Sequence, residues 1–350
     1  MKAVFSALQL GHAPTRYLSK GNIVGYPDSV ERARALLEGA RLAGASICAA
    51  RRQGAEGFGT VHDAAYLAFL RSAFARWREI PETGPELMPS LRPTIAHHNF
   101  SDHILAAAGR YMMDFSCPIV AETWTSAEAS ALTAITAADL VLKGEPVAYA
   151  LCRPPGHHAY GNRASGFCYL NNSAIAAERL RGQHGRVAIL DIDIHHGNGT
   201  QAIFYARADV LTVSVHADPA QYYPFYWGSA AEMGEEAGEG FNLNLPLALG
   251  SDDDTWLEAI DRGLDRIEAF APGALVVALG LDAHEKDPLQ GARVTQGGFA
   301  RAARRIAGLG LPTVIVQEGG YLTEHLSDNL AIFLSTFEGA LELAVNGGAG

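Results

Sequence analysis

Short apolar runs alternate with longer amphipathic segments along most of this 350-residue chain. The runs are rich in Val, Ile, Leu and Ala, which is typical of parallel strands buried on both faces. We expect strands at 3–6, 147–151, 187–192, 211–215, 275–281 and 313–316. Between them, helical periodicity predicts helices at 29–42, 126–142, 172–180, 253–270 and 298–307.

This alternation predicts the α/β class, with a central, mostly parallel sheet and helices on both faces. We expect one domain over 1–345, followed by a short tail at 346–350. Two segments break the pattern: residues 81–103 hold four prolines, and residues 228–240 are rich in glycine and acids. Each could be a functional loop or a solvated surface excursion. Three histidines of the first segment are expected to be exposed, namely His97, His98 and His103.

Composition excludes several classes of protein. Apolar residues make up 48% and charged residues 19% of the chain, which excludes a disordered or coiled-coil protein. The net charge of −11 argues against a nucleic-acid partner. The sequence has no apolar run of about 18 residues and its N-terminal apolar stretch is too short for a signal peptide, so we expect a soluble, cytoplasmic protein without membrane contact.

Polar residues gather just after the predicted strands, where open α/β folds bind their ligands. One strand runs into Asp191, Asp193 and His195, and another ends in Asp282. Because alternate residues of an extended chain point the same way, we expect the first three to face one side. Buried carboxylates need a cation to offset their charge. Asp193, His195 and Asp282 would offer one nitrogen and two oxygens to zinc, with a coordination position left open.

Two more candidate groups follow predicted strands. His157 and His158 come directly after a Pro-Pro-Gly turn, and Tyr321 comes after two glycines. Imidazoles titrate near neutral pH, so adjacent histidines beside a metal suit general acid–base catalysis. The Tyr321 hydroxyl could donate to a developing oxyanion, although a tyrosine by itself is more often an ordinary half-buried residue.

Together these motifs resemble the arginase-fold histone deacetylase superfamily. The resemblance is carried by RPPGHHA (153–159), GFCYLNN (166–172), DIDIHHGNGTQ (191–201), LGLDAHEKDP (279–288) and EGGY (318–321). Within the superfamily, the spacing and the segment SVHADP (214–219) are most similar to bacterial acetylpolyamine amidohydrolases. The resemblance extends from about residue 2 to 335. It implies a single arginase/deacetylase-like domain and a zinc-dependent amide hydrolase.

Roles for the motif residues follow from the resemblance. The three predicted ligands would bind Zn²⁺, although Fe²⁺ suits the same donors. His158 would be the general base and then the general acid, with His157 as its electrostatic neighbour and Asp191 holding the His157 ring. Tyr321 would polarise the scissile carbonyl. Asn198 stands where some relatives carry an aspartate paired with the second histidine, and an amide there should leave His158 less basic.

The resemblance also implies a substrate tunnel, a second cation and a second subunit. Four residues match positions that line a narrow acyl-lysine-like tunnel: Gly166, Phe167, Phe225 and His216. Ser214, with backbone oxygens around Asp191, matches a structural K⁺ site. In relatives the segment 81–118 narrows the entrance and joins a second subunit, so we expect this segment to be a lid, the substrate to be a small acylated amine and the protein to be a homodimer.

The sequence departs from the resemblance where the substrate would be held. Ser116 stands where protein deacetylases carry an aspartate, and Leu105 falls near a carboxylate position of polyamine deacetylases. Glu285 could be a replacement acid at the rim or an ordinary surface residue. Other acids close to these positions in sequence are Asp102, Asp114 and Glu122.

Several functions therefore stay open. The complete set of catalytic motifs favours hydrolysis of small N-acetylated amines, whereas Ser116 and Leu105 leave room for another small amide or for acetyl-lysine. A catalytically silent acyl-ligand sensor would not require Tyr321 or the histidine pair. A binuclear manganese ureohydrolase shares the fold, but its bridging-acid motifs are not apparent.

Overall fold

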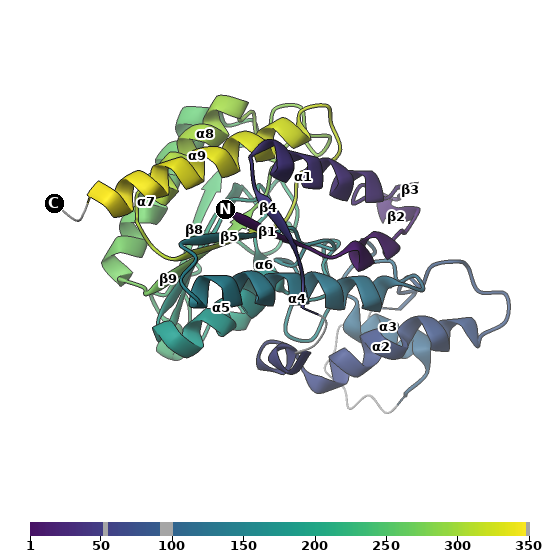
Figure 1. Ribbon diagram of the computed structural model, residues 1–350. Coiled ribbons are helices and arrows are strands. Elements are labelled where there is room, and N and C mark those ends of the chain that lie inside the picture. Colours follow the sequence, from purple (N-terminus) through teal and green to yellow (C-terminus); the bar gives the residue numbers. More distant parts are fainter. Residues whose placement is uncertain (52–54, 92–100, 348–350) are drawn as a thin grey trace.

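A parallel sheet of eight strands organises the structure, a computed structural model that describes residues 1–51, 55–91 and 101–347 (Figure 1). The strand order is β4-β1-β5-β10-β9-β6-β7-β8, and each neighbouring pair is parallel. The strands are Lys2–Phe5 (β1), Ser46–Ala49 (β4), Val147–Ala150 (β5), Val187–Asp191 (β6), Val210–Ala217 (β7), Asn242–Leu247 (β8), Ala274–Leu279 (β9) and Thr313–Gln317 (β10). A separate antiparallel hairpin joins β2 (Arg16–Ser19) to β3 (Asn22–Gly25).

Helices cover both faces of the sheet, as predicted (Figure 1). One layer consists of α1 (Val30–Leu42), α7 (Asp253–Phe270), α8 (Gln296–Ala307) and α9 (Leu326–Gly347). The opposite layer consists of α4 (Thr123–Leu142) and α5 (Asn172–His184), extended by α2 (Ala64–Arg78) and α3 (Ile104–Tyr111). The short helix α6 (Asn198–Phe204) lies between β6 and β7 in the chain.

Successive residues of the central strands point into the two opposite cores. In β6, Ala188 and Leu190 pack into the core with α7, α8 and α9, while Val187 and Ile189 pack into the core with α4 and α5. All four side chains are buried. Burial on both faces explains why such a strand is a continuous apolar run rather than an alternating one.

The six predicted strands and five predicted helices are all present, with some ends shifted by a few residues. Elements that the pattern missed include the edge strands β4 and β8. The sequence of β8 is NLNLPL and most of β4 is exposed, so neither edge strand is a continuous apolar run. Helices α2, α3, α6 and α9 and the β2–β3 hairpin were also not predicted.

The two interrupting segments are irregular where the structure describes them. Residues 228–240 form a loop with one 3₁₀ turn at Glu236–Gly238. In the other segment, residues 81–91 and 101–103 contain no helix, and His103 is exposed as predicted. His97 and His98 lie outside the described residues. Among the helices of the described ranges, none is long and apolar enough to cross a membrane.

Candidate active site

Three side chains of metal-binding type meet beyond the carboxyl ends of β6 and β9, which are neighbours in the sheet. They are Asp193, His195 and Asp282, all buried, and one ligand atom of each lies within 4.8 Å of the others. His195 Nδ1 lies 2.9 Å from Asp282 Oδ2 and 3.1 Å from Asp193 Oδ1. The structure therefore brings together the three ligands predicted from the sequence.

The reason for their alignment differs from the predicted one. Strand β6 ends at Asp191, so Asp193 and His195 lie in the following loop and not on an extended strand. Asp191 points to His157 instead of joining the cluster, with 2.9 Å between its Oδ2 and His157 Nδ1. The conformation of this loop, and not the alternation of side chains along a strand, therefore brings Asp193 and His195 together.

The surroundings of the cluster fit a divalent cation. A Cβ atom at Gly319 would lie 2.3 Å from Asp282 Oδ2 and 2.5 Å from Asp193 Oδ2, so only glycine allows both carboxylates to approach this closely. Burial lowers the pKa of His195, but its hydrogen bonds to the two carboxylates raise that pKa to about 9. The site therefore attracts positive charge. One imidazole nitrogen and two carboxylate oxygens are donors that suit Zn²⁺ or Fe²⁺.

The two adjacent histidines have opposite electrostatic surroundings. Burial lowers the pKa of His157, but the carboxylates of Asp191 and Asp193 raise it to about 10, so this ring is protonated at neutral pH. The pKa of His158 is well below its usual value, first because the ring is buried and then because of positive charge on His157 and His195. The ring centroids of His157 and His158 are 4.0 Å apart. A neutral imidazole is thus held beside a charged one, which suits a general base.

Asn198 contacts the second histidine, as the resemblance implied. It is the first residue of α6, and its Oδ1 lies 2.6 Å from His158 Nδ1. An aspartate at this position would add a charge that favours the imidazolium form. The hydrogen bond to the Asn198 amide raises the pKa of His158, but burial and the neighbouring histidines lower it more.

Tyr321 lies in the middle of the loop between β10 and α9 and is almost fully buried. The backbone N–H of Tyr321 donates a hydrogen bond of 2.8 Å to Asp287 Oδ2. Gly320 has φ +101°, a conformation that favours glycine, and its carbonyl accepts a hydrogen bond from buried Arg32. Burial raises the pKa of the Tyr321 hydroxyl well above its usual value, so the group stays a hydrogen-bond donor.

Glu318 and Asp287 are positioning residues that the sequence reasoning did not assign. Glu318 Oε2 accepts hydrogen bonds from the backbone N–H groups of Gly156 (2.6 Å) and His157 (3.0 Å), and its Oε1 accepts one from Ser173. Glu318 thereby ties the loop after β10 to the histidine loop after β5. Glu318 is part of the motif EGGY and Asp287 is part of LGLDAHEKDP, so their places in these motifs could have indicated a role at the site.

Gly166 packs against His158 and Phe167 against Tyr321, and their role in lining a substrate tunnel stays a prediction. A Cβ atom at Gly166 would lie 2.2 Å from His158 Cδ2, so the backbone packs directly on the ring. The Phe167 ring lies 5.9 Å from the Tyr321 ring in an edge-on contact. Tyr223, which the sequence reasoning missed, forms a further wall beside His158: its ring centroid lies 5.0 Å from that of His158.

The three other predicted substrate residues differ in burial. Phe225 is 62% exposed, and its ring centroid lies 6.4 Å from that of Tyr223, so it lies at the outer rim and its role in lining the tunnel stays a prediction. The structure does not support a tunnel position for His216, which is fully buried with its ring nitrogens 2.8 Å from Ser214 Oγ and 2.9 Å from the Gly228 carbonyl oxygen. The Glu285 side chain is 43% exposed beside Lys286, which fits a rim acid as well as an ordinary surface residue, so its role stays a prediction.

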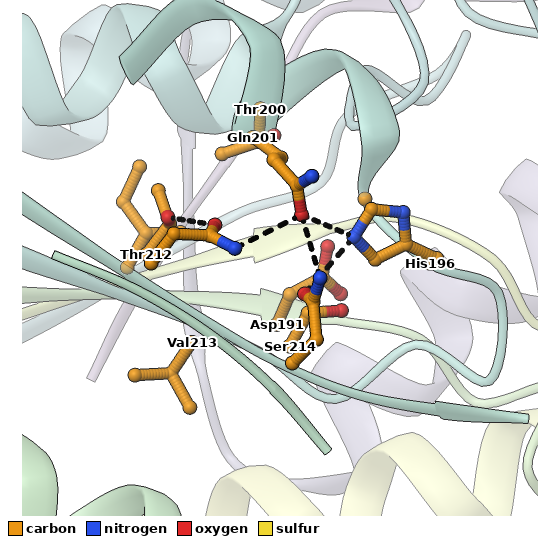
Figure 2. A pocket seen from close by; sticks show the side chains of 11 residues that line it. Asp191, His196, Thr200, Gln201, Thr212, Val213 and Ser214 are labelled. Carbon is orange, nitrogen blue, oxygen red and sulfur yellow. Dashed lines mark hydrogen bonds between the residues drawn. The ribbon is translucent and has the colours of Figure 1, made fainter. Parts of the chain in front are cut away.

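Ser214, the predicted K⁺ ligand, lines a small polar cavity between β6, β7 and α6 (Figure 2). The cavity measures about 10 Å³, which is room for about one water molecule or ion. Asp191 and His196 also line it, and Gln201 Oε1 lies 2.9 Å from His196 Nε2. The K⁺ assignment stays a prediction.

Asp114 lies two residues before Ser116, the position where protein deacetylases carry an aspartate. Its Oδ1 accepts hydrogen bonds from the Ser116 hydroxyl (2.5 Å) and backbone N–H (2.9 Å). Its Oδ2 accepts from Tyr223 (2.5 Å), Ser165 (3.0 Å) and the Gly166 N–H (3.1 Å). Both oxygens therefore already accept hydrogen bonds, and Asp114 links Tyr223 to Ser165 and Gly166 beside His158. Asp102 and Glu122 are exposed.

We expect Asp114→Asn to raise KM about tenfold for a small acylated amine, with a smaller decrease in kcat. The amide would present an N–H₂ group to donors, and hydrogen bonds to a charged group each contribute about 1.5–3 kcal/mol, so the wall would loosen. Steady-state kinetics checks this, with Asp102→Asn as the control on an exposed residue of the same segment. An unchanged KM in the Asp114 variant would contradict the role in wall positioning.

Known proteins that resemble this chain are amide hydrolases of the deacetylase type. A model of the histone deacetylase domain matches residues 26–337. Acetylpolyamine amidohydrolase of Burkholderia pseudomallei is 44% identical over 97% of this chain and 99% of its own length. Acetylpolyamine amidohydrolase of Mycoplana ramosa is 38% identical over 97% of this chain and 100% of its own length. The crystal structure of acetylpolyamine aminohydrolase from Burkholderia pseudomallei superposes with a TM-score of 0.94 at 44% identity, covering 97% of this chain and 99% of that chain.

The chain accordingly is an enzyme of the amide hydrolase class. It belongs to the histone deacetylase family. The resemblance inferred from the five sequence motifs is thereby confirmed, as is the deacetylase-type fold.

Proposed function

We propose that this chain is a zinc-dependent deacetylase that hydrolyses the amide of small N-acetylated amines such as acetylpolyamines. The observation that carries the proposal is the convergence of a buried ligand cluster and a neutral, buried His158 at one edge of the sheet. Relatives that are named acetylpolyamine amidohydrolase support the substrate class.

The chain's own residues account for the proton transfers of such a reaction. Asp193, His195 and Asp282 would hold the ion, which when bound acts as a Lewis acid on the carbonyl and on water. His158 takes a proton from the attacking water at Nε2 and later gives it to the leaving amine. The Tyr321 hydroxyl donates a hydrogen bond to the carbonyl oxygen as negative charge develops on it.

Other parts of the proposal concern assembly and the second cation. We propose a K⁺ ion near Ser214, supported by the polar cavity that this residue lines. We also propose a homodimer formed through residues 81–118, supported by the exposure of Leu91 in that segment. The cytoplasmic location stays a prediction from the sequence.

Hydrolysis of a neutral small amide is the second candidate function. Ser116 and Leu105 carry no charge, and both carboxylate oxygens of Asp114 already accept hydrogen bonds. These residues therefore offer no unoccupied carboxylate to a second ammonium group of the substrate.

A substrate panel on the zinc-loaded protein separates the candidates. We expect kcat/KM to be higher for acetylputrescine than for an acetylated lysine peptide or for a neutral anilide. A clear preference for the anilide would contradict the polyamine assignment and favour the second candidate. Absence of turnover on every substrate would contradict both candidate substrate classes. His158→Gln serves as the background control for contaminating activity.

A further inference from the structure

A chain of hydrogen bonds extends behind His158, away from the metal cluster. Asn198 contacts His158 through its Oδ1, and its Nδ2 lies 3.0 Å from the hydroxyl oxygens of both Tyr160 and Tyr226. The two hydroxyl oxygens are 3.2 Å apart. The Tyr226 hydroxyl donates to Met113 Sδ at 3.7 Å. Tyr160 lies two residues after His158, whereas Tyr226 comes from the loop after β7.

The tautomer of neutral His158 depends on whether the oxygen or the nitrogen of the Asn198 amide faces its Nδ1. To accept a proton at Nε2, the neutral ring must carry its own proton on Nδ1, which then needs an acceptor. The amide oxygen is such an acceptor. The opposite end of the amide has nearly the same shape but donates, and it would favour the ring tautomer with the proton on Nε2.

The tyrosine hydroxyls favour one of the two amide orientations. With Nδ2 toward the tyrosines, its two hydrogens have two acceptor oxygens. Tyr160 can then donate to Tyr226, and Tyr226 donates to Met113. In the reversed orientation, both hydrogens would point toward His158, the single hydrogen-bond partner that the described residues give Asn198 on that side. One N–H of this fully buried side chain would lose its partner, which is unfavourable.

We propose that Tyr160 and Tyr226 are positioning residues: they fix the amide orientation of Asn198 and thereby hold His158 in the tautomer that can act as a base. The inference rests on the proposed function of His158. It assigns a role to two hydroxyl groups outside the five sequence motifs that carry the family resemblance.

The matched test uses an acid at position 198. Both oxygens of a carboxylate accept hydrogen bonds, so its orientation does not matter and the hydroxyls become dispensable. We expect the double variant Tyr160→Phe/Tyr226→Phe to lose about tenfold in kcat with KM within about twofold of the wild type. In the Asn198→Asp background, the same two substitutions should change kcat by less than about twofold.

The control is Tyr205→Phe, which removes a hydroxyl from the same aromatic cluster but outside the hydrogen-bond chain. The Tyr205 ring contacts Trp227, on which Tyr160 stacks. Equal losses of kcat in the two backgrounds would mean a merely structural effect and would overturn the proposal. An unchanged kcat in the double variant would overturn it as well.

A spectroscopic measurement separates this inference from the proposed function. Long-range ¹H–¹⁵N NMR of the zinc-loaded protein reports which ring nitrogen of His158 is protonated, and His158→Gln identifies the resonances. We expect the proton on Nδ1 in the wild type and a mixture of tautomers in the double variant. Because this readout needs no turnover, it tests the tyrosines even if the protein fails to hydrolyse acetylated amines. A wild type with the proton on Nε2 would overturn the inference.

Discussion

Asp193→Ala is expected to abolish metal binding and to leave no measurable amide hydrolysis. Asp193 is fully buried, and its carboxylate lies between His195 and the Gly319 N–H, which donates to it at 2.6 Å. Loss of a residue that merely orients a ligand costs about 10–100-fold in metal affinity, so loss of the ligand itself should cost more. Elemental analysis after dialysis measures the metal directly.

A second readout for Asp193 does not depend on activity. A bound metal stabilises the folded state, so a chelator should lower the thermal midpoint of the wild type and leave that of the variant unchanged. Asp193→Asn keeps the shape of the side chain and serves if the alanine variant fails to fold. Asp209→Asn, at the opposite end of the sheet before β7, is the control. A variant that retained both zinc and activity would refute the ligand assignment.

His158→Gln is expected to lower kcat by about 10²–10⁴ while metal content and KM stay close to those of the wild type. Glutamine can fill much of the space of the ring, but it cannot accept and return a proton. His184→Gln, at the last residue of α5, is the matched control on a half-exposed histidine. A kcat within threefold of the wild type would exclude His158 as the base.

The pH dependence of kcat/KM tests the direction in which the pKa of His158 is shifted. Burial and the charge of His157 lower the pKa of His158, so its base form persists as the pH falls below the usual imidazole value of about 6.5. The acidic limb of kcat/KM in the wild type should therefore lie below pH 6.5 and should be absent in the glutamine variant. A limb above pH 7 would contradict the neutral state of His158.

Much of the fold could be predicted from the local pattern because its central strands are buried on both faces. The run VAILD of β6 carries this signal without knowledge of its neighbours. Edge strands do not carry it, since β8 has polar residues and a proline where one side is open. Helix α6 is seven residues long and begins inside a catalytic motif, so its periodicity is too short to detect.

The sequence by itself predicted the α/β class and named the three residues of the candidate metal cluster, the histidine pair and Tyr321, because these residues stand within short motifs just after predicted strands. Only the tertiary structure decided which aromatic ring forms the wall beside His158. Tyr223 and Phe225 are two residues apart in one loop, and the loop's path after β7 turns the first ring inward and leaves the second exposed. The same holds for Asp114, whose carboxylate collects donors from segments 51 and 109 residues away in sequence. Contacts over such separations depend on how loops pack, which no local pattern of hydrophobic and polar residues records.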